Sequence, residues 1–127
     1  MVTEDYKICV IGLGYVGLPL SVALASKYRV LGFDIDKKRI ADLRNLIDKS
    51  LMVEAKELSQ DNLSFSFKDK DIEECNIFIV TVPTPLTKNK KPELSYIISA
   101  VSLIKNFLKK GDIVVLESTV YPGVTEE

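Results

Sequence analysis

The fold is decided by one stretch near the amino terminus, which reads Lys7-Ile8-Cys9-Val10-Ile11-Gly12-Leu13-Gly14-Tyr15-Val16-Gly17-Leu18-Pro19. Residues 7–11 form a short, mostly apolar run bounded by glycine, a pattern typical of a strand buried on both faces. Apolar residues then recur at helical spacing over residues 16–24, and Pro19 is tolerated only close to a first helical turn. The stretch therefore predicts a buried strand, a glycine-rich turn and a helix that begins near Tyr15 or Val16.

The alternation of strand and helix continues along the chain. Apolar runs predict further buried strands at residues 29–33, 77–81 and Ile113–Leu116, and a short alternating run predicts one at residues 64–67. Helices are expected after Asp36 as N-cap, as a single turn at residues 54–58, and from Ser95 to the Lys109-Lys110-Gly111 stop. This order predicts an α/β, Rossmann-like, doubly wound and mainly parallel sheet with helices on both faces.

Composition favours one globular domain and excludes several kinds of chemistry. The 127 residues are 46% hydrophobic with a net charge of -1, and they contain no histidine, which excludes a histidine base, triad or metal ligand. Cys9 and Cys75 are too far apart for a metal knuckle, and their apolar contexts predict buried, reduced thiols with raised pKa values in the cytoplasm. Scattered charge and an apolar run interrupted by glycine and proline argue against nucleic acid and membrane partners.

The three glycines of the first turn form the spacing Gly-x-Gly-x-x-Gly between a predicted strand and a predicted helix. Gly12 would permit the tight turn, Gly14 would let a pyrophosphate approach the backbone, and Gly17 would let helix and strand pack closely. The backbone N–H groups of Tyr15 and Val16 are expected to face the phosphates at the start of the helix. A plain tight turn without a ligand is the alternative.

An acidic residue at the end of the second predicted strand indicates which dinucleotide is bound. Asp34 can accept hydrogen bonds from ribose hydroxyls and would repel a 2′-phosphate, which predicts NAD rather than NADP. The basic cluster Lys37-Lys38-Arg39 could accommodate such a phosphate, although a solvated helix face is the simpler interpretation. The sequence points to no metal site.

Beyond the turn, three segments make the chain resemble the nucleotide-sugar 6-dehydrogenases. They are Gly12-Leu13-Gly14-Tyr15-Val16-Gly17-Leu18-Pro19, Thr81-Val82-Pro83-Thr84-Pro85, and Glu117-Ser118-Thr119-Val120-Tyr121-Pro122-Gly123-Val124-Thr125-Glu126-Glu127. The last is similar to the branch that acts on UDP-N-acetylglucosamine, UDP-N-acetylgalactosamine or UDP-N-acetylmannosamine. Asp48-Lys49-Ser50 departs from that branch, which tends to show Asp-Arg-Thr there after a glycine.

The resemblance implies roles for individual residues. The glycine turn and Asp34 would hold NAD, Arg39 would reach the adenine ribose, and Thr84 would line the cofactor. Thr119 would contact the cofactor and position active-site water. Both threonines follow predicted strands at the carboxyl edge of the sheet, where such folds bind ligands. The alternatives are a rigid turn at Thr84 and a locally hydrogen-bonded hydroxyl at Thr119.

The resemblance also implies what the whole protein does. The family oxidises the sugar C6 hydroxyl to a carboxylate with two NAD, through a covalent intermediate on a cysteine of a C-terminal domain, for polysaccharide precursor synthesis. Residues 1–127 are then expected to be the N-terminal NAD-binding domain, truncated before its last strand and inactive alone, with the central and C-terminal UDP-sugar-binding domains and the homodimer contacts elsewhere. Alternatives are another hydroxyacid or 6-phosphogluconate type of dehydrogenase, or a dinucleotide-binding module without catalysis.

Overall fold

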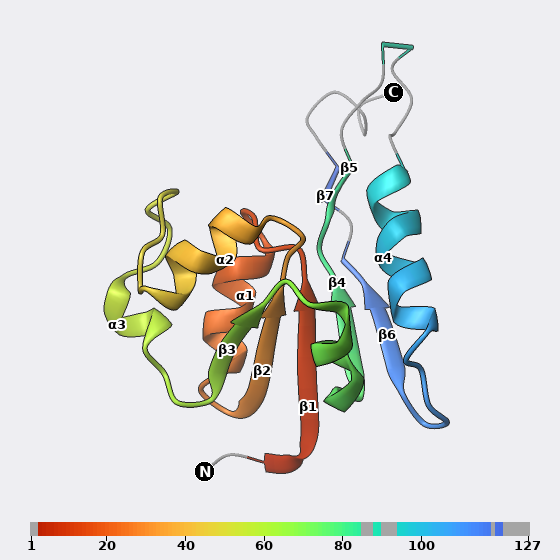
Figure 1. The fold of residues 1–127 in the computed structure, drawn as a ribbon, viewed down its shortest axis with the longest axis horizontal. Coiled ribbons are helices and arrows are strands. Elements are labelled where there is room, and N and C mark those ends of the chain that lie inside the picture. Colours follow the sequence, from red (N-terminus) through yellow and green to blue (C-terminus); the bar gives the residue numbers. More distant parts are fainter. Residues whose placement is uncertain (1–2, 85–87, 90–93, 118, 121–127) are drawn as a thin grey trace.

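The computed structural model describes residues 3–84, 88–89, 94–117 and 119–120 (Figure 1). Strands and helices follow one another in the order β1 (Thr3–Ile11), α1 (Gly17–Leu24), β2 (Tyr28–Phe33), α2 (Lys37–Arg44), α3 (Ala55–Leu58), β3 (Leu63–Ser66), η1 (Asp69–Glu74), β4 (Ile77–Val80), β5 (Pro83–Thr84), α4 (Ser95–Lys105), β6 (Ile113–Leu116) and β7 (Thr119–Val120). Pro85, Pro92 and residues 121–127 lie outside the described residues.

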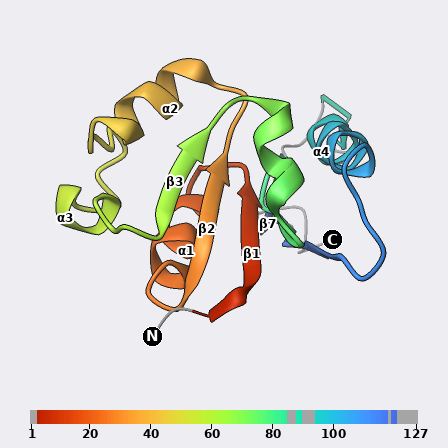
Figure 2. The same ribbon diagram turned by 60° about the horizontal axis from the view of Figure 1, so that its bottom comes forward.

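Five strands form one parallel sheet in the order β3-β2-β1-β4-β6. The chain winds outward from β1 to β3, then returns across η1 to place β4 on the other side of β1 (Figures 1 and 2). The strand order therefore reverses between β1 and β4, and sheets of this kind bind ligands outside the carboxyl ends of the strands at that point. The Rossmann-like parallel sheet predicted from the sequence is confirmed.

Two hydrophobic clusters lie on the two faces of this sheet. Side chains of α1 and α2, including Leu18 and Ile40, pack with the β1 side chains of Ile8 and Val10. In the other cluster, side chains of η1 and α4 pack against the opposite face of the sheet, and the fully buried Phe78 is one of its members. Because both faces of the central strands are covered, β1 and β4 are held firmly at the edge where the glycine-rich turn begins.

Several predicted boundaries differ from the structure. Helix α1 begins at Gly17 rather than at Tyr15 or Val16, and Val16 is its N-cap. Ser95 is the first residue of α4 rather than its cap, because Leu94 takes the cap position, and that helix ends at Lys105 before the predicted stop. The sequence pattern did not predict η1. Its only buried residue is Ile72, and a single apolar position shows no helical periodicity.

Strand β6 lies where predicted, but the prediction that it is buried was wrong. Its four residues are 37–56% exposed. In the sheet order β6 has one neighbour, β4, and an apolar run does not reveal whether a strand lies at the centre or at the edge of a sheet. Within the described ranges, no helix is long and apolar enough to cross a membrane.

Candidate functional site

The glycine-rich turn leaves β1 at the carboxyl edge of the sheet, and its glycines meet different surroundings. Gly12 has φ +99° and its N–H donates to the carbonyl of Phe33 at 2.8 Å. A Cβ on Gly17 would collide with the carbonyl oxygen of Gly12 and with the hydroxyl of Thr81, whereas a Cβ on Gly14 would meet nothing within 4 Å. Packing thus requires Gly12 and Gly17 to be glycine, while Gly14 faces open space that a ligand can use.

Backbone donors gather at the same open position. Among the described residues, no hydrogen-bond acceptor is found for the N–H groups of Gly14, Tyr15 and Val16. The Tyr15 side chain is 85% exposed, so it does not cover them. These N–H groups precede the first turn of α1, where the helix dipole favours an anion. The arrangement fits the pyrophosphate of a dinucleotide.

Asp34 directly follows β2 and lies beside the turn. One oxygen of its carboxylate accepts from the N–H of Leu13 at 2.9 Å, and the other accepts from the N–H of Asp36 at 3.0 Å. A carboxylate offers about four acceptor positions, so two remain for ribose hydroxyls. Asp34 therefore both shapes the turn and keeps the acceptors that the predicted ribose contact needs.

Thr81 is a site residue whose role the sequence did not reveal. It follows β4 and is 6% exposed, and its hydroxyl donates to the carbonyl of Gly12 at 2.7 Å and lies 3.1 Å from that of Ile11. The hydroxyl therefore supports the glycine-rich turn from the neighbouring strand. A threonine directly after an apolar strand was the available signal, but its partner lies 69 residues away.

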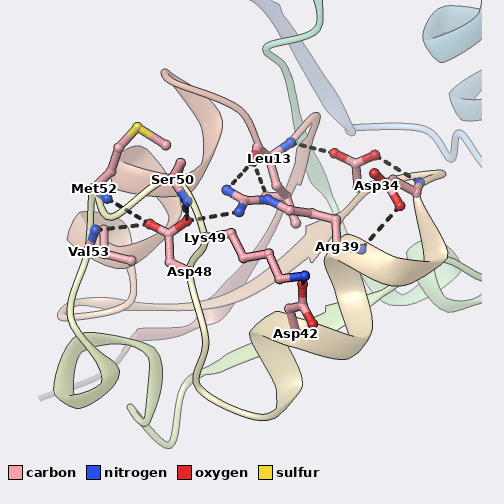
Figure 3. A network of polar contacts seen from close by, with 10 residues as sticks. Leu13, Asp34, Arg39, Asp42, Asp48, Lys49, Ser50, Met52 and Val53 are labelled. Carbon is pink, nitrogen blue, oxygen red and sulfur yellow. Dashed lines mark hydrogen bonds and ion pairs between the residues drawn. The ribbon is translucent and has the colours of Figure 1, made fainter.

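Arg39 points back from α2 toward the turn, as Figure 3 shows. Its Nε and one terminal nitrogen donate to the carbonyl of Leu13 at 3.1 and 2.9 Å, and its other terminal nitrogen donates to Asp48 at 2.9 Å. The helix is positioned by Asp36, the predicted N-cap, which accepts from the N–H groups of Lys38 and Arg39. Every nitrogen of the guanidinium is thus already bonded within the protein.

Two predicted residues, Thr84 and Thr119, come from short strands beyond the main sheet. Strands β5 and β7 pair in parallel, with Pro83 opposite Thr119 and Thr84 opposite Val120. The backbone thus brings these segments together, one after β4 and the other after β6. The side chains of Thr84 and Thr119 lie outside the described part, so their roles stay predictions.

A sequence model of one family matches residues 6–127, the UDP-glucose/GDP-mannose dehydrogenase family, NAD binding domain. The chain belongs to this family. The match spans the glycine-rich turn, Asp34 and Thr81, whose geometry therefore belongs to an NAD-binding domain. The cofactor predicted from Asp34 agrees with the family.

Individual relatives give the same result. UDP-N-acetyl-D-glucosamine 6-dehydrogenase of Pseudomonas aeruginosa is 54% identical over 98% of this chain and 30% of that protein, and the protein of that name from Salmonella typhi is 48% identical over 98% of this chain and 29% of its own length. The structure of a UDP-D-ManNAc dehydrogenase from Pyrococcus horikoshii superposes with a TM-score of 0.82 at 33% identity, over 94% of this chain and 30% of that one. The chain thus spans about 30% of the length of these two curated relatives.

One hollow of the described residues lies away from the glycine-rich turn. It measures about 460 Å³ and is lined by residues of β2, β3 and η1, among them Arg29, Ser64 and Asp71. Neither Asp34 nor a residue of the glycine-rich turn lines it.

The two cysteines of this family member lie together in one hydrophobic cluster, and both are buried. The neighbouring Cys75 thiol and burial raise the pKa of Cys9, as predicted. The prediction of a raised pKa for Cys75 was wrong. A hydrogen bond from Cys9, assisted by the positive charges of Lys7 and Lys109, outweighs burial and lowers the pKa of Cys75.

Proposed function

We propose that this chain is the NAD-binding domain of a UDP-N-acetylhexosamine 6-dehydrogenase. The N–H groups of Gly14, Tyr15 and Val16, which have no acceptor among the described residues, lie next to the Asp34 carboxylate and carry the proposal. The N–H groups match the pyrophosphate of an adenosine diphosphate, and the carboxylate matches its ribose. The names of the relatives at 54% and 48% identity support the sugar class. On this proposal the whole protein oxidises the sugar C6 hydroxyl to a carboxylate with two NAD.

Each residue has a defined part in the proposed site. Gly12 and Gly17 shape the turn, and the N–H groups at Gly14, Tyr15 and Val16 bind the pyrophosphate. Asp34 accepts hydrogen bonds from the ribose hydroxyls, and Arg39 lies near the same ribose.

Two further threonines complete the proposed site. Thr84 lines the cofactor, and Thr119 positions water beside it. The catalytic cysteine belongs to a C-terminal domain outside residues 1–127, and the central and C-terminal domains bind the UDP-sugar. The whole protein works as a cytoplasmic homodimer in polysaccharide precursor synthesis.

The full-length protein tests the proposed activity. We expect NADH to form when NAD is supplied with UDP-N-acetylglucosamine, UDP-N-acetylgalactosamine or UDP-N-acetylmannosamine, at two NADH per sugar. NADH fluorescence measures the yield, and UDP-glucose and GDP-mannose are the control substrates. NAD binding without NADH from any acetamido sugar would instead favour a binding module.

Replacing Asp34 by serine tests the cofactor assignment. The substitution removes the ribose acceptors and the negative charge that repels a 2′-phosphate. We therefore expect NAD affinity to fall about tenfold and the ratio of NAD affinity to NADP affinity to decrease. Calorimetric titration with both dinucleotides measures the two changes. Asp61→Ser, which changes a carboxylate outside the turn, is the matched control, and equal binding of NAD and NADP by the parent protein would contradict the assignment.

A further inference from the structure

One residue of the glycine-rich turn, Leu13, is held by side chains through both of the peptide units that flank it. The N–H of Leu13 donates to Asp34, while its carbonyl accepts from two nitrogens of Arg39 (Figure 3). The Leu13 side chain is itself 1% exposed and packs in the core. Leu13 therefore has little freedom to rotate, although it lies between two glycines.

The contact with Arg39 sets the direction of a neighbouring donor. The carbonyl of Leu13 and the N–H of Gly14 belong to the same planar trans peptide, so they point in opposite directions. An Arg39 that holds the carbonyl on the α2 side therefore turns the N–H of Gly14 to the opposite side, and that N–H has no acceptor among the described residues. A Cβ on Gly14 would also meet nothing within 4 Å. Arg39 thus fixes the orientation of the Gly14 N–H through the Leu13 carbonyl.

Asp48 fixes Arg39 in this position. Its side chain is fully buried, and the Arg39 side chain is 16% exposed. The carboxylate also accepts from the N–H groups of Ser50, Met52 and Val53 at 2.9–3.1 Å and from the Ser50 hydroxyl. The guanidinium is therefore anchored to a loop that is itself organised around the same carboxylate.

We propose that Asp48 and Arg39 are positioning residues for the pyrophosphate of the dinucleotide, with Asp48 acting through Arg39 and Arg39 acting through the Leu13–Gly14 peptide. The inference rests on the proposed NAD site and goes beyond it. It assigns a function to the loop after α2, and it gives Arg39 a role different from the direct ribose contact that the family resemblance implies.

The test compares three variants of the full-length protein, Asp48→Asn, Arg39→Lys and the double variant. Binding of ADP-ribose, which carries the pyrophosphate, and of adenosine, which does not, is measured by calorimetry at a temperature where circular dichroism shows each variant folded. We expect each single variant to weaken ADP-ribose binding about tenfold and to leave adenosine binding unchanged. Both residues act through the Leu13–Gly14 peptide. The double variant should therefore lose no more ADP-ribose affinity than the single variant that binds more weakly.

Two further measurements separate positioning from simple folding. In the full-length enzyme the KM for NAD should rise while kcat stays constant, and the amide resonance of Gly14 should move in both single variants without ligand. Asp42→Asn is the control, because it removes the nearby pair with Lys49 at 3.5 Å without touching Arg39 or Asp48.

Each outcome has a distinct meaning. Variants that melt earlier but bind ADP-ribose like the parent protein would overturn the proposal and leave the pair as a fold element. Equal losses for adenosine and ADP-ribose would also overturn it, in favour of direct contact between Arg39 and the nucleoside. A parent protein that binds neither NAD nor ADP-ribose would instead remove the proposed function itself.

Discussion

Replacing Gly17 by alanine is expected to lower the free energy of unfolding by about 3 kcal/mol, the upper end of what overpacking usually costs. The added methyl group would collide with the backbone carbonyl of Gly12 and with the hydroxyl of Thr81. Neither can move away easily, because one belongs to a turn fixed by β1 and the other follows β4. Urea unfolding followed by circular dichroism measures the loss.

Gly14→Ala is the matched control in the same turn. Its Cβ would meet nothing within 4 Å, so stability should change by less than about 0.5 kcal/mol. The same methyl group would stand where a pyrophosphate approaches, so NAD affinity should fall about tenfold or more. Equal stability of the two variants would contradict the packing argument, and unchanged NAD affinity in Gly14→Ala would contradict the phosphate position.

Replacing Asp48 by alanine is expected to cost about 3–5 kcal/mol of unfolding free energy, as when one partner of a buried ion pair is removed. The substitution leaves the buried Arg39 charge without its carboxylate and removes the acceptor for three backbone N–H groups of the following loop. Urea unfolding at neutral pH measures this loss. Asp42→Ala, which breaks a partly exposed pair with Lys49, should cost less than about 1 kcal/mol.

The pH dependence of the free energy of unfolding tests the contribution of the ionised Asp48 carboxylate. Burial opposes the charged form of Asp48, but hydrogen bonds from Ser50 and Arg39 outweigh it and hold the pKa of this carboxyl well below its ordinary value. Its contribution is therefore complete above the unfolded-state pKa of about 4 and is lost as pH falls toward the folded-state pKa. Unfolding free energies measured between neutral and acidic pH should fall less steeply for Asp48→Ala than for the parent protein.

Local patterns predicted the central part of the fold and of the site. The strand before the glycines, the helix after them and the N-cap at Asp36 each depend on residues close in sequence, and the structure has all three. The exposure of β6 could not be predicted in this way, because it depends on which strand lies beside it. The support from Thr81 and the bond between Arg39 and Leu13 were missed for the same reason, since each joins residues far apart in the chain.

Because Thr81 supports the glycine-rich turn, the shape of that turn depends on tertiary structure. The three glycines occur early in the chain, but the hydroxyl that supports them comes from the strand that enters the sheet only after the chain has reversed across η1. A folding intermediate with β1, β2 and β3 in place would hold the glycine motif without its finished shape. Cofactor binding should therefore select molecules in which both halves of the sheet have joined, so that NAD stabilises the completed sheet by mass action.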